Sequence, residues 1–250
     1  MIRFDNVSFR VGSATLVQNL NLHIPEGETL VLLGQSGSGK TTTLKLINHL
    51  LTPTEGIVSV RDKSTLDWDP IQLRRMIGYV IQEVGLFPHF NVAENIGLVP
   101  RLEKWDEERS RVRVKEVLQL VGLDPNQFLS RYPHQLSGGQ RQRVGVARAL
   151  CADPPMLLLD EPFGALDPIS RAEIQNEFQQ LQRRLSKTMV FVTHDVAEAF
   201  LIGDRIALMK EGRLVALATP KEFIKSKDPV VKSFLKPLES LLLIAEEVAK

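Results

Sequence analysis

A glycine-rich segment between two apolar stretches constrains this chain more than any other feature. Residues 34–41 read Gly-Gln-Ser-Gly-Ser-Gly-Lys-Thr and fit the pattern G-x-x-x-x-G-K-[ST]. The apolar run 29–33 before them is typical of a buried parallel strand. The stretch 41–51 after them predicts a helix, because its apolar residues recur at helical spacing. The segment is therefore expected to be a loop from a strand to a helix in an α/β fold.

The chemistry of this loop suits a polyphosphate. Glycines at 34, 37 and 39 let successive N–H groups turn toward one anion, and a helix start adds further donors. Lys40 is positioned for the β- and γ-phosphates and Thr41 for Mg²⁺. A flexible linker is the alternative, but the strand before and the helix after argue against it. The residues predicted to bind the nucleotide phosphates here are Gly34, Gln35, Ser36, Gly37, Ser38, Gly39, Lys40, Thr41 and Thr42.

Two adjacent acids follow a second apolar run. Residues 156–159 are Met-Leu-Leu-Leu and lead into Asp160 and Glu161. Carboxylates at the end of a buried strand are costly unless a cation or a substrate uses them. Asp160 suits the Mg²⁺ shell, whereas Glu161 points the other way and is suited to orient or deprotonate a water.

A second helix start carries small polar residues. Residues 136–140 read Leu-Ser-Gly-Gly-Gln, and the apolar residues that follow fall on one helical face at Val144, Ala147, Leu150 and Cys151. Ser137 is a good N-cap, and the free N–H groups of this helix could hold a second anion. A plain Ser-Gly-Gly turn is the alternative.

These motifs together resemble those of the ATP-binding-cassette ATPases. Residues 136–140, followed by Arg-Gln-Arg-Val at 141–144 and Ala-Arg-Ala-Leu at 147–150, are similar to that family's signature. The resemblance implies an α/β P-loop NTPase of the ATP-binding-cassette fold. Such a fold has a RecA-like core with a mixed sheet, an N-terminal antiparallel β subdomain and a helical subdomain.

The resemblance also implies a head-to-tail homodimer that encloses two ATP molecules. The residues implied to reach the partner's ATP are Leu136, Ser137, Gly138, Gly139, Gln140 and Asp167. Asp167-Pro168 is also a good helix start.

Further site residues follow from the same likeness. Gln82 matches the glutamine that reaches Mg²⁺ and the attacking water, and His194 matches the histidine that contacts the γ-phosphate. The implied catalytic set is Lys40, Gln82, Glu161 and His194. The implied Mg²⁺ ligands are Thr41, Gln82 and Asp160. No catalytic role is expected for His23, His49, His89 or His134.

One position departs from the family pattern. The aromatic residue that stacks on adenine in this family is replaced here by Val11. Phe9 lies two residues away, on the same face if this stretch is a strand. Adenine is expected to lean on Val11, on Phe9 or on neither strongly.

Other stretches narrow the resemblance to one branch of importers. Residues 68–75, 84–96, 99–100 and 162–168 closely resemble the branch that takes up glycine betaine, choline, carnitine and related osmoprotectants. This implies an ATPase subunit that works with transmembrane permease subunits, and indirectly with a solute-binding protein, at the cytoplasmic face of the cell membrane.

Other functions stay open at this point. An amino acid or another small polar solute is the alternative cargo. A soluble cassette ATPase that does not transport is less favoured. A non-catalytic cassette is disfavoured by Glu161 and His194.

Composition agrees with this class. Hydrophobic residues make up 43% of the 250, and the net charge of +1 argues against a dedicated nucleic-acid binder. The single cysteine, Cys151, excludes an internal disulfide and is expected to be buried. No signal peptide or membrane-spanning stretch is expected.

The predicted organisation has two parts. An ATP-binding-cassette domain covers 1–228, with a helical subdomain inserted at about 88–151. A tail at 229–250 is expected to form an amphipathic helix through Leu238, Leu241, Leu242, Ala245 and Val248.

Within the insertion, Asp106 is expected to cap a helix that Gly122 ends. The apolar residues of 84–96 are expected either to dock a partner's helix or to fill the insertion's own core.

Overall fold

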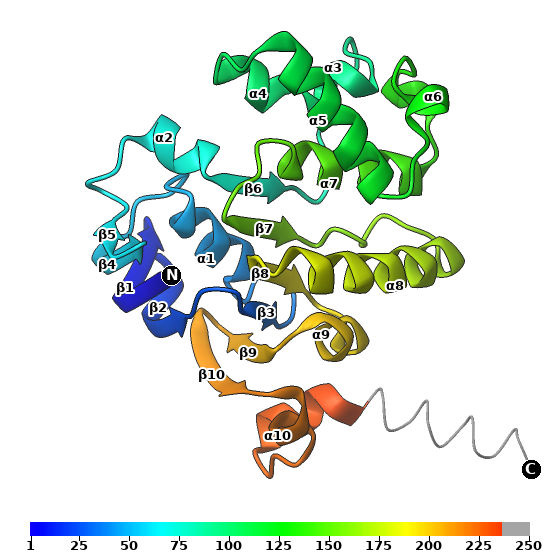
Figure 1. The fold of residues 1–250 in the computed structure, drawn as a ribbon. Coiled ribbons are helices and arrows are strands. Elements are labelled where there is room, and N and C mark those ends of the chain that lie inside the picture. Colours follow the sequence, from blue (N-terminus) through cyan, green and yellow to red (C-terminus); the bar gives the residue numbers. More distant parts are fainter. Residues whose placement is uncertain (237–250) are drawn as a thin grey trace, which may run out of the picture. The chain divides into compact units, whose positions relative to one another are not determined.

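The computed structural model describes residues 1–236 and divides the chain into two compact units (Figure 1). Within the described part, the first unit contains Met1–Thr65 and residues 190–236, and the second contains Leu66–Met189. The predicted tail helix residues from Leu238 on lie outside the described part. Within residues 1–236, no helix is both long and apolar enough to cross a membrane.

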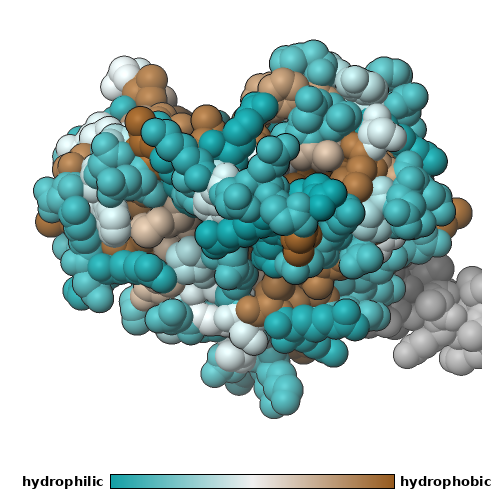
Figure 2. Space-filling view, turned by 45° about the horizontal axis from the view of Figure 1, so that its top comes forward, coloured by the Kyte–Doolittle hydropathy of each residue, from teal (hydrophilic) through white to brown (hydrophobic). Residues whose placement is uncertain are grey.

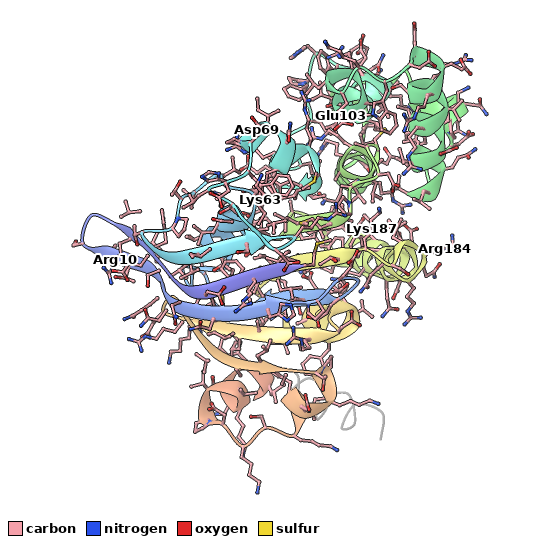
Figure 3. All side chains as sticks on the ribbon, turned by 60° about the vertical axis from the view of Figure 1, so that its left-hand side comes forward. Arg10, Lys63, Asp69, Glu103, Arg184 and Lys187 are labelled. Atoms are coloured by element: carbon pink, nitrogen blue, oxygen red, sulfur yellow. The ribbon has the colours of Figure 1, made fainter. Side chains whose placement is uncertain are left out.

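An antiparallel sheet begins the first unit. Strands β1 (Ile2–Val11), β2 (Ala14–Ile24), β4 (Glu55–Val60) and β5 (Lys63–Ser64) pair in the order β2-β1-β4-β5. Buried residues alternate with exposed ones along β2, as expected when one face of a sheet is packed. Arg10, near the β1–β2 turn, forms an ion pair with Glu55 of β4 at 2.9 Å (Figure 3).

The other strands of the first unit form a mixed arrangement. Strand β3 (Thr29–Leu33) is entirely buried and runs parallel to β9 (Arg205–Lys210), whereas β10 (Arg213–Ala218) is antiparallel to β9. Glu211 and Gly212 join β9 to β10 with φ of 50° and 75°, as a two-residue hairpin turn requires. The predicted α/β fold class with a mixed sheet is confirmed.

Three short helices and a further helical stretch complete this unit. They are α1 (Lys40–Ile47), α9 (Val196–Ile202), α10 (Pro220–Ile224) and residues 229–236. The helix predicted over 41–51 ends four residues early. His49 has a φ of 52°, which stops the helix, and Leu50 is exposed rather than packed.

The second unit holds most of the helices. Its elements before residues 136–140 are α2 (Pro70–Arg75), β6 (Ile77–Val80), α3 (Val92–Ile96), α4 (Leu98–Leu102), α5 (Glu107–Leu120), α6 (Pro125–Phe128) and the 3-10 turn Pro133–Gln135. Its later elements are α7 (Gly138–Leu150), β7 (Met156–Asp160) and α8 (Pro168–Leu185). Strands β6 and β7 are parallel, and β8 (Thr188–Thr193) crosses the boundary between the units.

The predicted helix signals in this unit are confirmed. Asp106, Ser137 and Asp167 are the N-caps of α5, α7 and α8, and each side chain accepts a backbone N–H of the first turn. Val114, Val117 and Leu118 are buried on α5, and Gly122 follows it with a φ of 73°. The predicted bounds of the domains themselves stay predictions.

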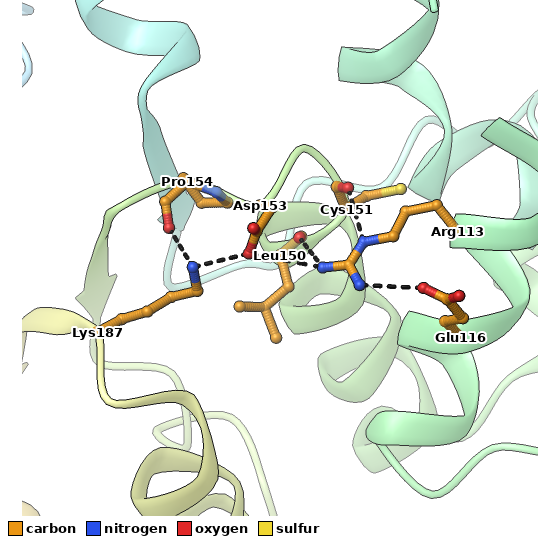
Figure 4. A network of polar contacts seen from close by, with 7 residues as sticks. All are labelled: Arg113, Glu116, Leu150, Cys151, Asp153, Pro154 and Lys187. Carbon is orange, nitrogen blue, oxygen red and sulfur yellow. Dashed lines mark hydrogen bonds and ion pairs between the residues drawn. The ribbon is translucent and has the colours of Figure 1, made fainter. Parts of the chain in front are cut away.

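A polar network secures the end of α7 (Figure 4). The Arg113 guanidinium donates to the carbonyls of Leu150 and Cys151 at 3.3 and 3.2 Å, which occupies groups that a helix end leaves unpaired. Lys187 Nζ donates to Asp153 Oδ1 at 2.8 Å and to the Pro154 carbonyl at 2.7 Å. This network fixes the turn that leads from α7 into β7.

The surface of the described residues carries both hydrophobic and hydrophilic side chains. Figure 2 shows one face on which hydrophobic residues lie singly or in small groups among hydrophilic ones. Asp69 at the start of α2, Glu103 after α4 and Arg184 near the end of α8 are among the charged residues of the second unit (Figure 3). Isolated apolar residues on such a surface need no special explanation.

Candidate functional site

The glycine-rich loop joins β3 to α1, as the sequence predicts. Gly37 and Gly39 have φ of 78° and 99°, a region that side chains disfavour. A Cβ on Gly39 would lie 2.5 Å from the Leu16 carbonyl oxygen, so no other residue fits there. Gly39 is also the N-cap of α1 and offers no side chain to its N–H groups. No side-chain cap therefore occupies the first-turn N–H groups of α1.

Lys40 lies inside the loop. Its Nζ donates to the carbonyls of Gly34 and Gln35 at 2.7 and 2.9 Å, and the residue is almost fully buried. Ser38 Oγ is also buried and has no hydrogen-bond partner among residues 1–236. A buried hydroxyl without a partner is costly, and a phosphate oxygen would satisfy it. The loop residues therefore fit a polyphosphate.

A cavity of about 190 Å³ lies beside this loop in the first unit. One wall consists of Gln35–Ser38 and another of Met209–Glu211, while Val230, Ser233 and Phe234 form the third. Residues 230–234 were not predicted to lie beside the loop. No signal in the sequence could have shown this, since almost 200 residues separate the two segments.

His194 stands at the end of β8 and is exposed. The turn after it is well fixed, because the Thr193 hydroxyl donates to buried Glu198 at 2.5 Å and accepts the Asp195 N–H at 2.9 Å. Asp195 in turn caps α9. The histidine is therefore carried on a rigid strand-to-helix turn of the first unit.

The second unit contains the predicted acids and Gln82. Asp160 ends β7 and is buried. Burial and, to a smaller extent, the negative charge of Asp160 raise the pKa of Tyr79 to about 12. Glu161 follows with a φ of 43°. Gln82 Nε2 donates to Glu161 Oε2 at 3.4 Å. The structure thus brings together Gln82 and Glu161, which lie 79 residues apart in sequence.

The Ser137 segment is an ordered helix start. Ser137 Oγ accepts the Gln140 N–H at 3.2 Å, and Gln140 Oε1 accepts the Ser137 N–H at 2.9 Å, which is a capping box. A Cβ on Gly139 would lie 2.8 Å from Ile174 of α8. Ser137 is exposed, so it is accessible to a ligand from outside this chain.

Asp167 is also exposed, and its carboxylate accepts the Ser170 N–H at 3.0 Å. This backbone hydrogen bond lowers the pKa of Asp167. The cap that the sequence predicts for α8 is therefore the role that the structure gives to this side chain.

Val11 and Phe9 differ sharply in exposure. Val11 is 57% exposed at the β1–β2 turn, whereas Phe9 is 9% exposed in the core of the sheet. Phe9 therefore offers little ring surface to a base, and Val11 offers only a small aliphatic side chain.

Within residues 1–236, no three His, Cys, Asp or Glu side chains lie close enough together to hold a metal ion by themselves. The predicted Mg²⁺ set instead combines a hydroxyl, an amide and one carboxylate. Such oxygen ligands suit Mg²⁺, which keeps several waters and phosphate oxygens in its shell.

Comparison with known proteins decides the family. The family model described as ABC transporter matches residues 17–164, which include the glycine-rich loop, the Ser137 segment and both acids. The chain belongs to the ABC transporter family. The predicted family is thereby confirmed.

Curated members of the family are similar over most of this ABC transporter chain. The osmoprotectant import ATP-binding protein OsmV of Salmonella typhimurium is 52% identical over 92% of this chain and 61% of its own length. The choline transport ATP-binding protein OpuBA of Bacillus subtilis is 49% identical over 94% of this chain and 62% of its own. The chain thus spans about three fifths of these relatives.

Solved structures agree with the fold. A dimeric ATP-binding cassette in a post-hydrolysis state bound to ADP and Pi is 37% identical, with a TM-score of 0.77 over 88% of this chain and 99% of that one. The subunit cbiO1 of an ABC transporter complex from Clostridium perfringens has a TM-score of 0.83 at 28% identity and covers 98% of both chains. The predicted ATP-binding-cassette fold is confirmed.

Proposed function

We propose that this chain is the ATP-hydrolysing subunit of an importer for glycine betaine, choline, carnitine or a related osmoprotectant. The approach of Gln82 to Glu161 supports the catalytic part of the proposal, because a general base must lie within hydrogen-bond reach of the water it deprotonates and the Gln82 amide can hold a water there. The cargo is supported by relatives named for osmoprotectant, choline and carnitine transport at about 50% identity.

In this proposal the glycine-rich loop binds the phosphates of ATP. Backbone N–H groups of residues 34–42 surround the phosphate oxygens, and the Lys40 ammonium offsets charge on the β- and γ-phosphates. Mg²⁺, held by Thr41, Gln82 and Asp160, supplies charge neutralisation at the phosphates. Val11 lies against adenine and contributes little to the choice of base.

Hydrolysis depends on the orientation of one water. The Gln82 amide holds this water near Glu161, whose carboxylate accepts a proton as the water attacks the γ-phosphate in line. His194 steadies the water and the γ-phosphate from the first unit. Because such groups act by position, the loss of any one of them lowers turnover more than it lowers ATP binding.

Two copies of the chain act together. Leu136–Gln140 and Asp167 of one copy close over the ATP of the other, with the first turn of α7 facing the γ-phosphate. The cassette neighbour that is solved as a dimer supports this arrangement.

Permease subunits dock on the second unit, where exposed Ile81 and Phe87 flank the Gln82 loop. A solute-binding protein delivers the cargo to the permease. The chain lies at the cytoplasmic face of the membrane.

The decisive experiment separates binding from hydrolysis. Glu161→Gln should bind ATP with near wild-type affinity, lose turnover and accumulate as a closed dimer in light scattering. Lys40→Ala should lose ATP binding itself. Equal phosphate release by Glu161→Gln and the wild type would overturn the role of Glu161.

The cargo is tested in the assembled transporter. ATPase activity of the chain, reconstituted with its permease and binding protein, should rise with glycine betaine, choline or carnitine. Stimulation by an amino acid alone would favour the alternative cargo. Stimulation by DNA or ribosomes without a permease would favour a soluble non-transport cassette.

A further inference from the structure

The loop that carries Gln82 contains an unusual backbone turn. The Val84 N–H donates to the Ile81 carbonyl at 3.0 Å, so Gln82 and Glu83 are the two central residues of a β-turn. Val84 and Gly85 follow with φ of 54° and 55°. A β-branched residue at positive φ is strained and persists only where its surroundings impose it.

Arg148 on α7 holds this turn from outside. One guanidinium nitrogen donates to the Val84 carbonyl at 2.6 Å, and the other donates to the Gly85 carbonyl at 2.7 Å. Burial lowers the pKa of Arg148. Within residues 1–236, no carboxylate forms an ion pair with Arg148. Arg148 is half-buried, and its charge is matched by the dipoles of two loop carbonyls.

Gly145, one turn earlier on the same face of α7, provides the space for Val84. A Cβ built on Gly145 would lie 2.6 Å from Val84 Cγ1, well inside van der Waals contact. Gly145 is buried within the helix, where glycine costs about 1 kcal/mol relative to alanine. The close packing of Val84 gives a physical reason for a glycine at this helical position.

From these contacts we infer that Arg148 and Gly145 are positioning residues for hydrolysis. The two Arg148 hydrogen bonds and the room left by the missing Cβ of Gly145 fix Val84 and Gly85 in place. They thereby fix the turn that presents the Gln82 amide to Glu161. This inference deepens the proposed function and rests on it. It assigns no contact with nucleotide to either residue.

The first test replaces the Arg148 guanidinium, which donates through two nitrogens, by an ammonium group with one nitrogen. Arg148→Lys keeps the positive charge but cannot bridge two adjacent carbonyls. We expect turnover to fall roughly tenfold with little change in the affinity for ATP, because a displaced Gln82 costs orientation rather than binding. Arg143→Lys is the matched control, since Arg143 is also on α7 and also donates to a backbone carbonyl, that of Val121.

A double-mutant comparison separates positioning from folding. If Arg148 acts through Gln82, Arg148→Lys should lower turnover no further in a Gln82→Ala background. A purely structural role would give the same fractional loss in both backgrounds. That result, or wild-type turnover in Arg148→Lys, overturns the inference.

The second test restores the fit by paired substitutions. Gly145→Ala should lower turnover, since its methyl group displaces Val84. Val84→Ala removes Cγ1 and makes room for the new methyl group, so Gly145→Ala should lower turnover by a smaller factor in a Val84→Ala background than in the wild type. The same factor in both backgrounds, in a double variant that unfolds at the wild-type temperature, contradicts the proposed fit.

Hydrogen exchange of the amides at 82–87 supplies a readout that does not depend on ATP hydrolysis. Arg148→Lys should raise exchange in this segment, whereas Arg143→Lys should not. Wild-type protein that fails to hydrolyse ATP would overturn the proposed function, and the exchange result would still decide whether Arg148 holds the loop. If amide exchange at 82–87 is the same in Arg148→Lys as in the wild type, Arg148 does not hold this loop in place.

Discussion

Among the buried polar residues outside the candidate site, Asn95 is expected to contribute most to the free energy of unfolding. It lies on α3 and is fully buried, and its side-chain amide makes four hydrogen bonds. Its Oδ1 accepts the Phe87 N–H at 2.8 Å. Its Nδ2 carries two hydrogens, which are shared among the carbonyls of Phe87, Phe90 and Asn91 at 3.1, 3.0 and 3.0 Å. One amide thus holds the whole segment between the Gln82 loop and α3.

The cost of Asn95→Ala follows from which groups lose their partner. The Phe87 carbonyl still accepts from the Phe90 N–H, and the Asn91 carbonyl still accepts from the Asn95 N–H. The Phe87 N–H and the Phe90 carbonyl lose the partner that the structure gives them. Two such groups cost about 1–3 kcal/mol each. Entry of a water into the vacated space reduces this cost, so we expect a loss of about 3 kcal/mol.

Thermal and urea unfolding measure this loss. For a chain of this size, about 3 kcal/mol lowers the melting temperature by roughly 6–12 °C. Asn126→Ala is the control, since Asn126 is exposed on α6 and should shift unfolding by less than about 0.5 kcal/mol. A melting temperature for Asn95→Ala within the range of this control would refute the reasoning.

Substitution by aspartate sharpens the test. In Asn95→Asp a carboxylate oxygen would face three carbonyl oxygens, so the variant should be less stable than Asn95→Ala at pH 7. Burial would raise the folded-state pKa of the new carboxyl above its unfolded value. Stability relative to the wild type should therefore recover as the pH falls and the protonated carboxyl becomes a donor. A variant that grows less stable relative to the wild type in acid contradicts this assignment.

Three further expectations concern the second unit. Gly78→Ala should destabilise the chain by about 3 kcal/mol in urea unfolding, because a Cβ there would lie 2.5 Å from the Ala149 carbonyl oxygen and 2.4 Å from Leu157. Asp153→Asn should cost less than about 1 kcal/mol at pH 7, since the carboxylate is largely exposed. The Lys187 hydrogen bond lowers the pKa of Asp153, so its contribution should be present above the ordinary carboxyl pKa and be lost as pH falls through the lowered one, as unfolding at several pH values would show. Burial raises the pKa of Cys151 to about 12, so the native thiol should resist a thiol reagent at pH 8 and react only after unfolding.

The elements that the sequence predicted well are those with local physical signals. Ser137, Asp106 and Asp167 cap their helices because a short oxygen-bearing side chain reaches the first-turn N–H groups from the residue before the helix. The glycine-rich loop was equally predictable, since its backbone needs positive φ at fixed positions.

Features that depend on distant contacts were not predictable in this way. The helix over 41–51 was expected to be longer because Leu50 and Leu51 continue the apolar spacing, but His49 turns the chain and leaves Leu50 exposed. The packing of Val84 on Gly145 joins segments 61 residues apart in the printed sequence, and nothing local to either marks it. The wall that residues 230–234 add beside the glycine-rich loop is of the same kind.

The buried thiol of Cys151 has a practical consequence for observing this molecule at work. Because the chain has no other cysteine, a new cysteine on the surface would be the only site open to a maleimide dye or a spin label. Ile169, 76% exposed at the start of α8, is a suitable attachment point. A probe there could report distances between two protomers during turnover without removal of the native sulfur.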